Sequence, residues 1–159
     1  MYRIGFGFDA HRFSEGRHLV LGGVEIPFEH GLSGHSDADV LCHALCDALL
    51  GAAGAGDIGQ HFPDTDPSLR GISSLVLLER TARIVRERGY EPVHADLVVV
   101  AEAPKLAPHI RAMRANISRA LGVEQDCVSI KATTTEGLGF IGRGLGIAAY
   151  AVCTLGSRD

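Results

Sequence analysis

The sequence predicts an α+β fold, in which a mixed β-sheet carries helices packed on one face. Alternating apolar segments lie near both ends of the chain, helical segments lie in its middle, and the order of these elements is not a strict strand–helix alternation. A length of 159 residues is enough for one domain, 1–159, with a buried core.

The first third of the chain predicts a strand, a hairpin and a helix. Tyr2–Phe13 alternates as a strand does, and the extended stretch His18–Ile26 is broken by a glycine pair that suits a hairpin turn. A helix then begins near Ser36, whose hydroxyl suits an N-cap with Asp39 three residues on. One side of this helix is an apolar stripe, and the opposite side carries Asp39, His43 and Asp47 at a spacing of four. The stripe is formed by Ala38, Leu41, Leu45, Leu49 and Ala52.

The remaining elements follow from similar signals. After an acidic loop at 56–67, the sequence predicts helices over 73–88 and 108–121, each ended by a glycine. Strands are predicted over 94–102, 128–133 and 146–155. The strand at 94–102 is apolar on both faces and no helix is left to cover the second face, so we expect that face to be buried against other subunits.

Composition narrows the classes of partner. A net charge of −4 argues against nucleic acid and against an anionic membrane surface. The N-terminus lacks the pattern of a signal peptide, and the longest apolar run is too short for a membrane span. Four cysteines without the spacing of a secreted framework suit a reduced compartment, so we expect a cytoplasmic protein. Cys42 and Cys46 flank the apolar stripe, which favours packing over metal binding.

The segment GFGFDAHRF predicts a metal site. Asp9 and His11 are two residues apart in a strand, so their side chains point to one face about 7 Å apart. His43, on the polar side of its helix, is the natural third ligand. One carboxylate and two imidazoles with a fourth position open are typical of catalytic zinc. The alternative is that Asp9 caps a turn and His11 is a half-buried core histidine.

Other segments suggest a phosphate-containing ligand. KATTTEGLGFIGRG, at 131–144, combines hydroxyls, glycines, an acid and an arginine, so it suits a phosphate cradle in which Glu136 holds Mg²⁺ or Mn²⁺. A tight hairpin is the alternative. HSDAD, at 35–39, puts His35 and Ser36 at a helix N-terminus, which favours an anion, although ordinary capping also explains it. The acidic loop suits polyol hydroxyls or a solvated connection, and AEAPKLAPH, at 101–109, suits a planar base.

These motifs together resemble the 2-C-methyl-D-erythritol 2,4-cyclodiphosphate synthase family of the non-mevalonate isoprenoid pathway. The resemblance rests on GFDAHRF, on the long stretch from GGVEIPFEHGLSGHSDAD through GDIGQHFPDTDP, on AEAPKLAPHI and on IKATTTEGLGFIGRGLGIA. It covers essentially the whole chain in order, without large gaps.

The resemblance implies a role for each matching residue. Zinc, or another divalent transition metal, would be held by Asp9, His11 and His43, and Mg²⁺ or Mn²⁺ by Glu136. His35 and Thr134 would be catalytic, stabilising the transition state. The substrate would contact Ser36, Asp57, Ile58, Gly59, Phe62, Pro63, Asp64, Thr65, Asp66, Ala101, Glu102, Ala103, Pro104, Lys105, Leu106, Ala107, Thr133, Thr135, Phe140 and Arg143.

The resemblance also implies the assembly and the reaction. The family is a homotrimer with sites between subunits, and a prenyl diphosphate is expected at the trimer axis near Arg143, where Leu145 replaces an acidic residue of the family. The implied reaction is attack by the 2-phosphate of a cytidine diphosphate-linked methylerythritol on its own β-phosphorus, with release of CMP. The sequence leaves two alternatives: a metal-dependent phosphohydrolase and a non-catalytic trimer that binds prenyl diphosphates.

Overall fold

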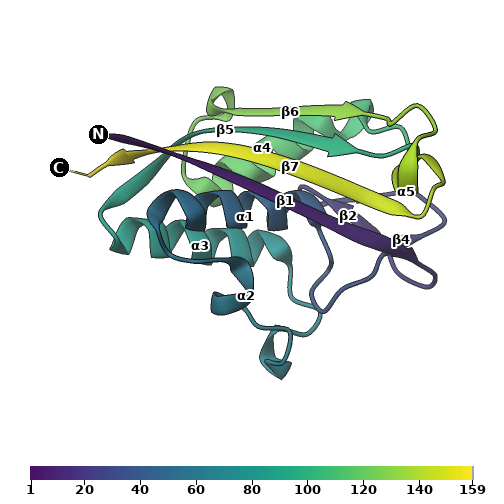
Figure 1. Ribbon diagram of the computed structural model, residues 1–159, viewed down its shortest axis with the longest axis horizontal. Helices are drawn as coiled ribbons and strands as arrows, with labels where there is room; N and C mark the ends of the chain where they lie inside the picture. Colours follow the sequence, from purple (N-terminus) through teal and green to yellow (C-terminus); the bar gives the residue numbers. More distant parts are fainter. Residues whose placement is uncertain (159) are drawn as a thin grey trace.

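The computed structural model describes residues 1–158 and places one mixed sheet against a layer of helices (Figure 1). The strand order is β4-β1-β7-β5-β6, and all neighbouring pairs are antiparallel except β5 and β6, which are parallel. The strands are β1 (Tyr2–Ser14), β4 (Gly31–Leu32), β5 (Tyr90–Val100), β6 (Val128–Thr133) and β7 (Gly146–Ser157). The predicted hairpin forms a separate two-stranded sheet from β2 (Leu19–Leu21) and β3 (Val24–Ile26). The predicted α+β class is confirmed.

Three long helices form the second layer. They are α1 (Val40–Ala53), α3 (Ser74–Glu87) and α4 (Ile110–Leu121). The loops that connect the elements contain the short helices α2 (Ile58–His61) and α5 (Gly139–Gly142) and 3₁₀ turns at Pro67–Leu69, Ala107–His109 and Gln125–Cys127. Helix α1 lies at the centre, in contact with β1, β7 and α3.

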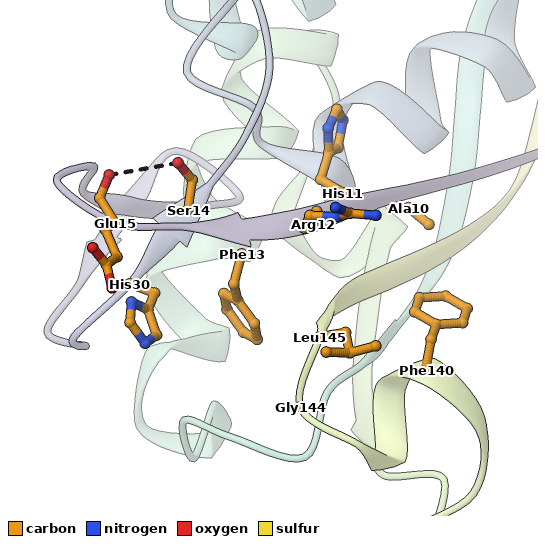
Figure 2. A pocket seen from close by; sticks show the side chains of 10 residues that line it. All are labelled: Ala10, His11, Arg12, Phe13, Ser14, Glu15, His30, Phe140, Gly144 and Leu145. Atoms are coloured by element: carbon orange, nitrogen blue, oxygen red, sulfur yellow. Dashed lines mark hydrogen bonds between the residues drawn. The ribbon is translucent and has the colours of Figure 1, made fainter.

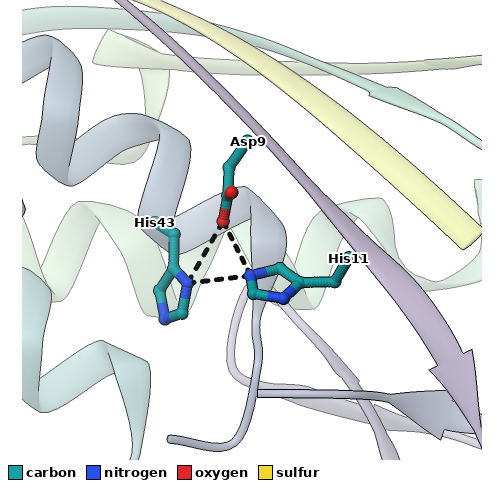
Figure 3. Close-up of side chains that lie close together, drawn as sticks. All are labelled: Asp9, His11 and His43. Atoms are coloured by element: carbon teal, nitrogen blue, oxygen red, sulfur yellow. Dashed lines mark hydrogen bonds and ion pairs between the residues drawn. The ribbon is translucent and has the colours of Figure 1, made fainter. Parts of the chain in front are cut away.

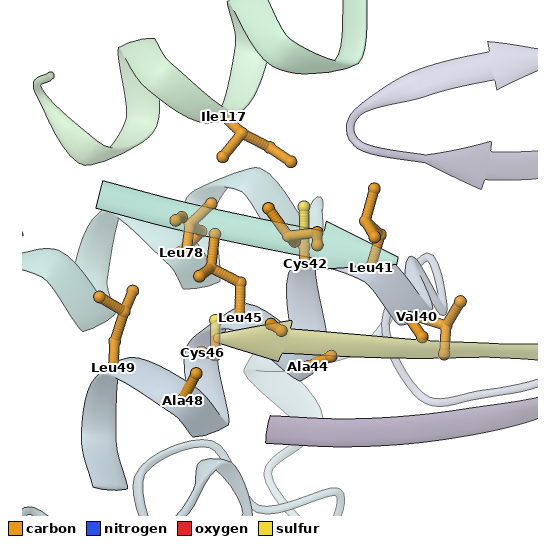
Figure 4. Packing of buried hydrophobic residues seen from close by; sticks show 14 of the residues in the cluster. Val40, Leu41, Cys42, Ala44, Leu45, Cys46, Ala48, Leu49, Leu78 and Ile117 are labelled. Atoms are coloured by element: carbon orange, nitrogen blue, oxygen red, sulfur yellow. The ribbon is translucent and has the colours of Figure 1, made fainter. Parts of the chain in front are cut away.

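Helix α1 is buried on nearly every side. Eleven of its fourteen residues are buried, and the other three, His43, Asp47 and Gly51, follow one another at a spacing of four. Figure 4 shows the sulfur atoms of Cys42 and Cys46 among the leucines of the core, so the prediction that these cysteines pack is confirmed. The sequence predicted a polar row of Asp39, His43 and Asp47 on this helix. Only His43 and Asp47 of that row are available to the site.

Two glycines allow α1 to pack closely on β1. A Cβ atom on Gly7 would lie 2.8 Å from the backbone nitrogen of Ala48, and closer still to the carbonyl oxygen of Ala44. A Cβ atom on Gly5 would lie 2.9 Å from Cβ of Ala52. Side chains alternate along a strand, so these glycines share the helix-facing side of β1 with the two metal-ligand candidates that follow them. The glycines set the distance between strand and helix at the site.

The start of α1 differs from the prediction. Asp39, not Ser36, is the N-cap, because its carboxylate accepts a hydrogen bond from the backbone nitrogen of Cys42 at 3.2 Å. The same carboxylate accepts from the nitrogens of Gly22 and Gly23 at 3.0 and 2.7 Å. Asp39 is fully buried, and this burial raises the pKa of its carboxyl group. It therefore holds the hairpin against α1 rather than facing the site.

The boundaries of two other segments also differ. Strand β5 begins at Tyr90, four residues earlier than predicted, because a bulge between Pro92 and His94 accommodates a proline that cannot donate to the ladder. The predicted loop at 56–67 contains α2, which begins where the Asp57 carboxylate accepts a hydrogen bond from the Gln60 nitrogen.

The sheet face opposite the helices is apolar and exposed over β1 and β7, whereas its β5–β6 part carries an ion pair between Asp96 and Lys131. Ile4 and Phe6 on β1 are 75% and 63% exposed, and Tyr150 on β7, 42% exposed, packs beside Phe6 and Phe8. Singly exposed apolar residues are ordinary, but a continuous apolar face marks a surface that another molecule covers. Within residues 1–158, no helix has both the length and the apolar character that crossing a membrane would require.

Candidate functional site

Asp9, His11 and His43 meet between β1 and α1 (Figure 3). Asp9 Oδ2 lies 2.8 Å from His11 Nε2 and 3.2 Å from His43 Nδ1, and these two nitrogens are 3.2 Å apart. Zinc bonds of about 2.0–2.2 Å in tetrahedral geometry place neighbouring ligand atoms about 3.4 Å apart. The three atoms are therefore already close to the spacing that a bound ion needs, and the sequence prediction that they form one group is confirmed.

The two imidazoles offer different nitrogens to the site. His11 Nδ1 lies 2.7 Å from the carbonyl oxygen of Ser33, which can only accept, so the Nδ1–H group donates there and Nε2 faces the site. His43 is turned the other way, with Nε2 facing the hydroxyls of Ser36 and Ser74 at 3.0 and 2.9 Å. Hydrogen bonds to the outer nitrogen are the usual means of orienting a metal-binding histidine.

The charges of the group support one another. Burial alone would raise the pKa of Asp9, but hydrogen bonds and charge interactions with His11 and His43 bring it down to about 2. Burial alone would lower the pKa of His11, but the hydrogen bond and the charge of Asp9 outweigh it and raise that pKa. The carboxylate is therefore ionised at neutral pH, as a metal ligand must be.

A pocket of about 380 Å³ opens beside the two histidines of this group. Its lining includes six of the predicted site residues outside the metal group: His35, Ser36, Ile58, Gly59, Phe62 and Asp64. Leu69, Ile72 and Leu77 make its apolar wall. The candidate metal group thus faces a cavity with both polar and apolar walls, as small-ligand sites have.

Hydrogen bonds hold the loops of this pocket in place. His35 Nε2 lies 2.8 Å from the carbonyl oxygen of Asp66 and so joins the two predicted substrate loops. The Asp66 carboxylate accepts from the nitrogen and hydroxyl of Ser68, which lowers its pKa. The Asp57 carboxylate likewise accepts from the Gln60 nitrogen at 2.9 Å, so both carboxylates cap the short helical turns that follow them. Pro63 and Thr65 lie on the same loop without lining the pocket.

The other predicted residues gather at the ends of β5 and β6. The Ala101 nitrogen donates to the Thr133 carbonyl oxygen at 3.0 Å, and Glu102 Oε1 accepts from the nitrogen and hydroxyl of Thr135 at 2.8 and 3.0 Å. Parallel pairing of β5 and β6 brings these two segments together. Thr134 and Glu136 are exposed in the same segment, and the Glu136 nitrogen donates to the Thr134 hydroxyl at 3.1 Å. The rest of the 101–107 segment and Phe140 and Arg143 follow these strand ends.

Within one chain, the 101–107 and 133–136 segments of the second group do not meet the metal group. Strand β1 carries the metal group, β6 leads into the second group, and β7 and β5 lie between them. Three strand spacings of about 4.8 Å separate the two strands by about 14 Å.

A second pocket, of about 620 Å³, lies where the end of β1 faces α5 (Figure 2). Of the predicted site residues, His11 and Phe140 line it, and Figure 2 shows the His11 side chain on the opposite side of the strand from Phe140. The metal group therefore belongs to the smaller pocket.

Sequence reasoning did not assign three supporting residues. The Arg17 guanidinium donates to the carbonyl oxygens of Gly34 and Ser36 at 2.7 and 2.6 Å, and so fixes the loop that carries His35. Asp47 accepts from the Ile58 nitrogen at 2.8 Å and positions α2. Ser74 contacts His43. Asp47 could have been found from its place in the polar row on α1. No local sequence pattern marks Arg17 or Ser74.

Comparison with known proteins identifies the family of the chain. Residues 2–156 match the model of the YgbB family. The 2-C-methyl-D-erythritol 2,4-cyclodiphosphate synthase of Syntrophomonas wolfei is 61% identical over 150 residues, which cover 94% of this chain and 96% of that protein. A solved structure of a 2C-methyl-D-erythritol-2,4-cyclodiphosphate synthase in a CDP-bound form is 45% identical with a TM-score of 0.88, covering 97% of this chain and all of that one.

A longer protein shares the same fold over part of its length. The bifunctional IspDF of Campylobacter jejuni is 46% identical to this chain, with a TM-score of 0.96. The match covers all of this chain and 43% of the length of IspDF. The described fold, the Asp-His-His group and these full-length matches have one explanation: the chain belongs to the YgbB family, the family of the 2-C-methyl-D-erythritol 2,4-cyclodiphosphate synthases.

Proposed function

We propose that the chain converts 4-diphosphocytidyl-2-C-methyl-D-erythritol 2-phosphate to 2-C-methyl-D-erythritol 2,4-cyclodiphosphate with release of CMP. The observation that carries this proposal is the Asp9, His11 and His43 group opening into a pocket lined by His35, in a chain about 60% identical to synthases named for that product. The enzyme is then a phosphorus–oxygen lyase of the non-mevalonate isoprenoid pathway.

The donor atoms suggest which metals the site would take. One carboxylate oxygen and two imidazole nitrogens suit Zn²⁺ or another divalent transition metal. The Glu136 carboxylate, exposed beside Thr134, suits a hard ion such as Mg²⁺ or Mn²⁺. Ions bound at these positions would supply Lewis-acid stabilisation of charge on diphosphate oxygens.

The chain itself would supply position and hydrogen bonds. The reaction needs no general base, because the attacking phosphate is already ionised, and its main requirement is that the two phosphates are held together. The loop at 57–66 would bind the methylerythritol hydroxyls, and the segment 101–107 would bind the cytosine and ribose. His35 and Thr134 would then stabilise the charge on the phosphate oxygens in the transition state.

We propose a homotrimer with each active site between adjacent subunits. Two observations support it: the apolar sheet face is exposed in the single chain, and the metal group and the second group of predicted residues are separated by two strands. A neighbouring subunit would bring its own 133–136 and 101–107 segments to the metal group. The mass in solution should be three times the 16.8 kDa of one chain.

Three further points complete the proposal. The chain acts as one domain over 1–159. All four cysteines are free thiols, which supports a cytoplasmic location. A prenyl diphosphate would bind at the trimer axis near Arg143, where the exposed apolar Leu145 offers an alkyl chain a contact that an acidic residue would not.

A turnover assay with product analysis tests the proposal. The cytidine diphosphate-linked substrate should give CMP and the cyclic diphosphate in equal amounts, and a chelator should abolish both products. Inorganic phosphate or an uncyclised diphosphate would instead indicate hydrolysis. Tight prenyl diphosphate binding with no turnover would indicate a binding protein.

A further inference from the structure

His43 has a distinct partner on each ring nitrogen. Nδ1 faces Asp9 and His11, and Nε2 lies 2.9 Å from the hydroxyl oxygen of Ser74. The His43 side chain is only 12% exposed, and Ser74, the first residue of α3, is fully buried. Water therefore competes little for these hydrogen bonds, and protein groups decide which nitrogen carries the hydrogen.

The partners of Ser74 fix the direction of its hydrogen bond with His43. The Ser74 hydroxyl is also hydrogen-bonded to Oδ1 of Asp37. A carboxylate can only accept, so the single hydroxyl hydrogen of Ser74 goes to Asp37. The Ser74 oxygen is then an acceptor toward His43 and favours the tautomer with its hydrogen on Nε2. The Asp9 carboxylate opposes this in the metal-free protein, because it accepts from a hydrogen on Nδ1, and a metal ion at that position requires Nδ1 to be bare. In the Nε2–H tautomer, Nδ1 has a free lone pair directed at the candidate metal position.

The Asp37 carboxylate is itself well held. Its Oδ2 accepts from the Ser74 nitrogen at 3.1 Å, and its Oδ1 accepts from the Asp39 nitrogen at 3.1 Å. Ser36 completes the arrangement, because its hydroxyl lies 3.3 Å from the Ser74 oxygen and can donate there. The turn before α1 and the first residue of α3 thus form one hydrogen-bonded unit behind the histidine.

We propose that Ser74 and Asp37 are positioning residues for the metal-binding His43. They keep the hydrogen on Nε2 and aim Nδ1 at the ion, in the manner of the carboxylate–histidine pairs behind many zinc sites, but with a serine hydroxyl inserted between the two. Without the Ser74 hydroxyl, Ser36 could donate to Nε2, and the hydrogen could then move to Nδ1 and block the ligand position. This inference rests on the proposed function only in taking the three residues as a metal site.

Zinc titration of the chelator-treated protein, without substrate, tests the proposal. Ser74→Ala should lower zinc affinity by roughly 10- to 100-fold, the usual effect of losing such a partner. Asp37→Asn should also lower it, because the amide can turn the Ser74 hydroxyl around. Ser73→Ala is the matched control, since the neighbouring Ser73 is exposed and its side chain makes no capping hydrogen bond. Its zinc affinity should equal that of the wild type.

Nitrogen NMR of the metal-free protein at pH 8 gives a readout that does not depend on catalysis. The wild type should show a larger share of the His43 tautomer with its hydrogen on Nε2 than Ser74→Ala does. Wild-type affinity together with an unchanged tautomer in both variants would overturn the proposal, as would a wild type that binds no zinc.

The same proteins separate this proposal from the proposed function. Suppose that Ser74→Ala binds zinc more weakly and the wild type forms no cyclic diphosphate. This result would refute the proposed function and support the positioning role of Ser74. If Ser74→Ala instead had normal zinc affinity and formed the cyclic product normally, the proposed function would be supported and the positioning role would be refuted.

Discussion

Replacing Gly7 by alanine should damage the metal site without touching a ligand. The new Cβ atom would lie 2.8 Å from the backbone nitrogen of Ala48, whereas such atoms normally stay beyond about 3.4 Å. Strand β1 and helix α1 must therefore separate by more than about half an ångström. His43 lies on α1 next to Ala44, whose carbonyl oxygen is closer still to the new atom, so His43 moves away from Asp9.

The magnitude follows from the packing. Inserting a methyl group into a close-packed contact costs about 1–3 kcal/mol. For a chain of this length a loss of about 2 kcal/mol lowers Tm by roughly 4–8 °C. Atomic misplacement of about 1 Å can reduce a catalytic rate by about 100-fold, so a shift of half that size should reduce turnover at least 10-fold and weaken zinc binding.

Zinc titration and thermal unfolding of the chelator-treated protein measure both effects. Gly51→Ala is the control, because Gly51 is on the exposed side of the same helix and a Cβ there would meet no described atom within 4 Å. That change should stabilise the helix by about 1 kcal/mol and leave zinc affinity unchanged. If Gly7→Ala kept both the Tm and the zinc affinity of the wild type, the claim that glycine sets the strand–helix distance would be wrong.

Three further perturbations have defined outcomes. Folding lowers the pKa of Asp9 below its ordinary 3.8 and raises the pKa of His11 above its ordinary 6.5. The free energy of unfolding of the metal-free wild type should therefore exceed that of Asp9→Asn by the largest amount between about pH 4 and 6.5. Urea unfolding should show this difference disappearing toward pH 2 and shrinking above pH 6.5. Asp39→Asn should cost about 1–3 kcal/mol in the same assay, because an amide cannot accept all the hydrogen bonds from Gly23 and its neighbours. Arg17→Ala should lower kcat by up to about 100-fold with zinc stoichiometry unchanged, because the loop beside the metal group loses its clamp.

Each of these has a contrary result. A stability difference for Asp9→Asn that persisted at pH 2 would mean that the carboxylate is not the titrating group. Asp39→Asn at wild-type stability would mean that the buried carboxylate does not tie the hairpin to α1. Loss of zinc from Arg17→Ala would place the arginine in support of the metal ligands rather than of the neighbouring loop.

Local periodicity carried the prediction of the metal group. The two-residue period of a strand puts Asp9 and His11 on one face, and the helical spacing isolates His43 on the polar side of α1. These patterns are local, so they can be read from a single sequence. Residue types also indicated Glu136, His35 and Ser36, and the family resemblance supplied the remaining residues of the candidate site.

Contacts between distant segments explain what the sequence did not predict. Asp39 replaces Ser36 as the N-cap because it also binds the hairpin turn, a partner seventeen residues earlier. Ser74 lies thirty-one residues from His43, and nothing in its surroundings marks it as a partner. The separation of the two groups of site residues depends on strand order, which no local pattern encodes.

The central burial of α1 has a consequence for metal exchange. A helix that is covered on nearly every side opens only when the whole domain unfolds, so its amide hydrogens should exchange with deuterium among the slowest in the chain. His43 is thus anchored in the most persistent part of the fold. Removing the ion should leave the backbone of the site in place, unlike a zinc finger, whose structure is lost with its metal. Reloading would then require no refolding step.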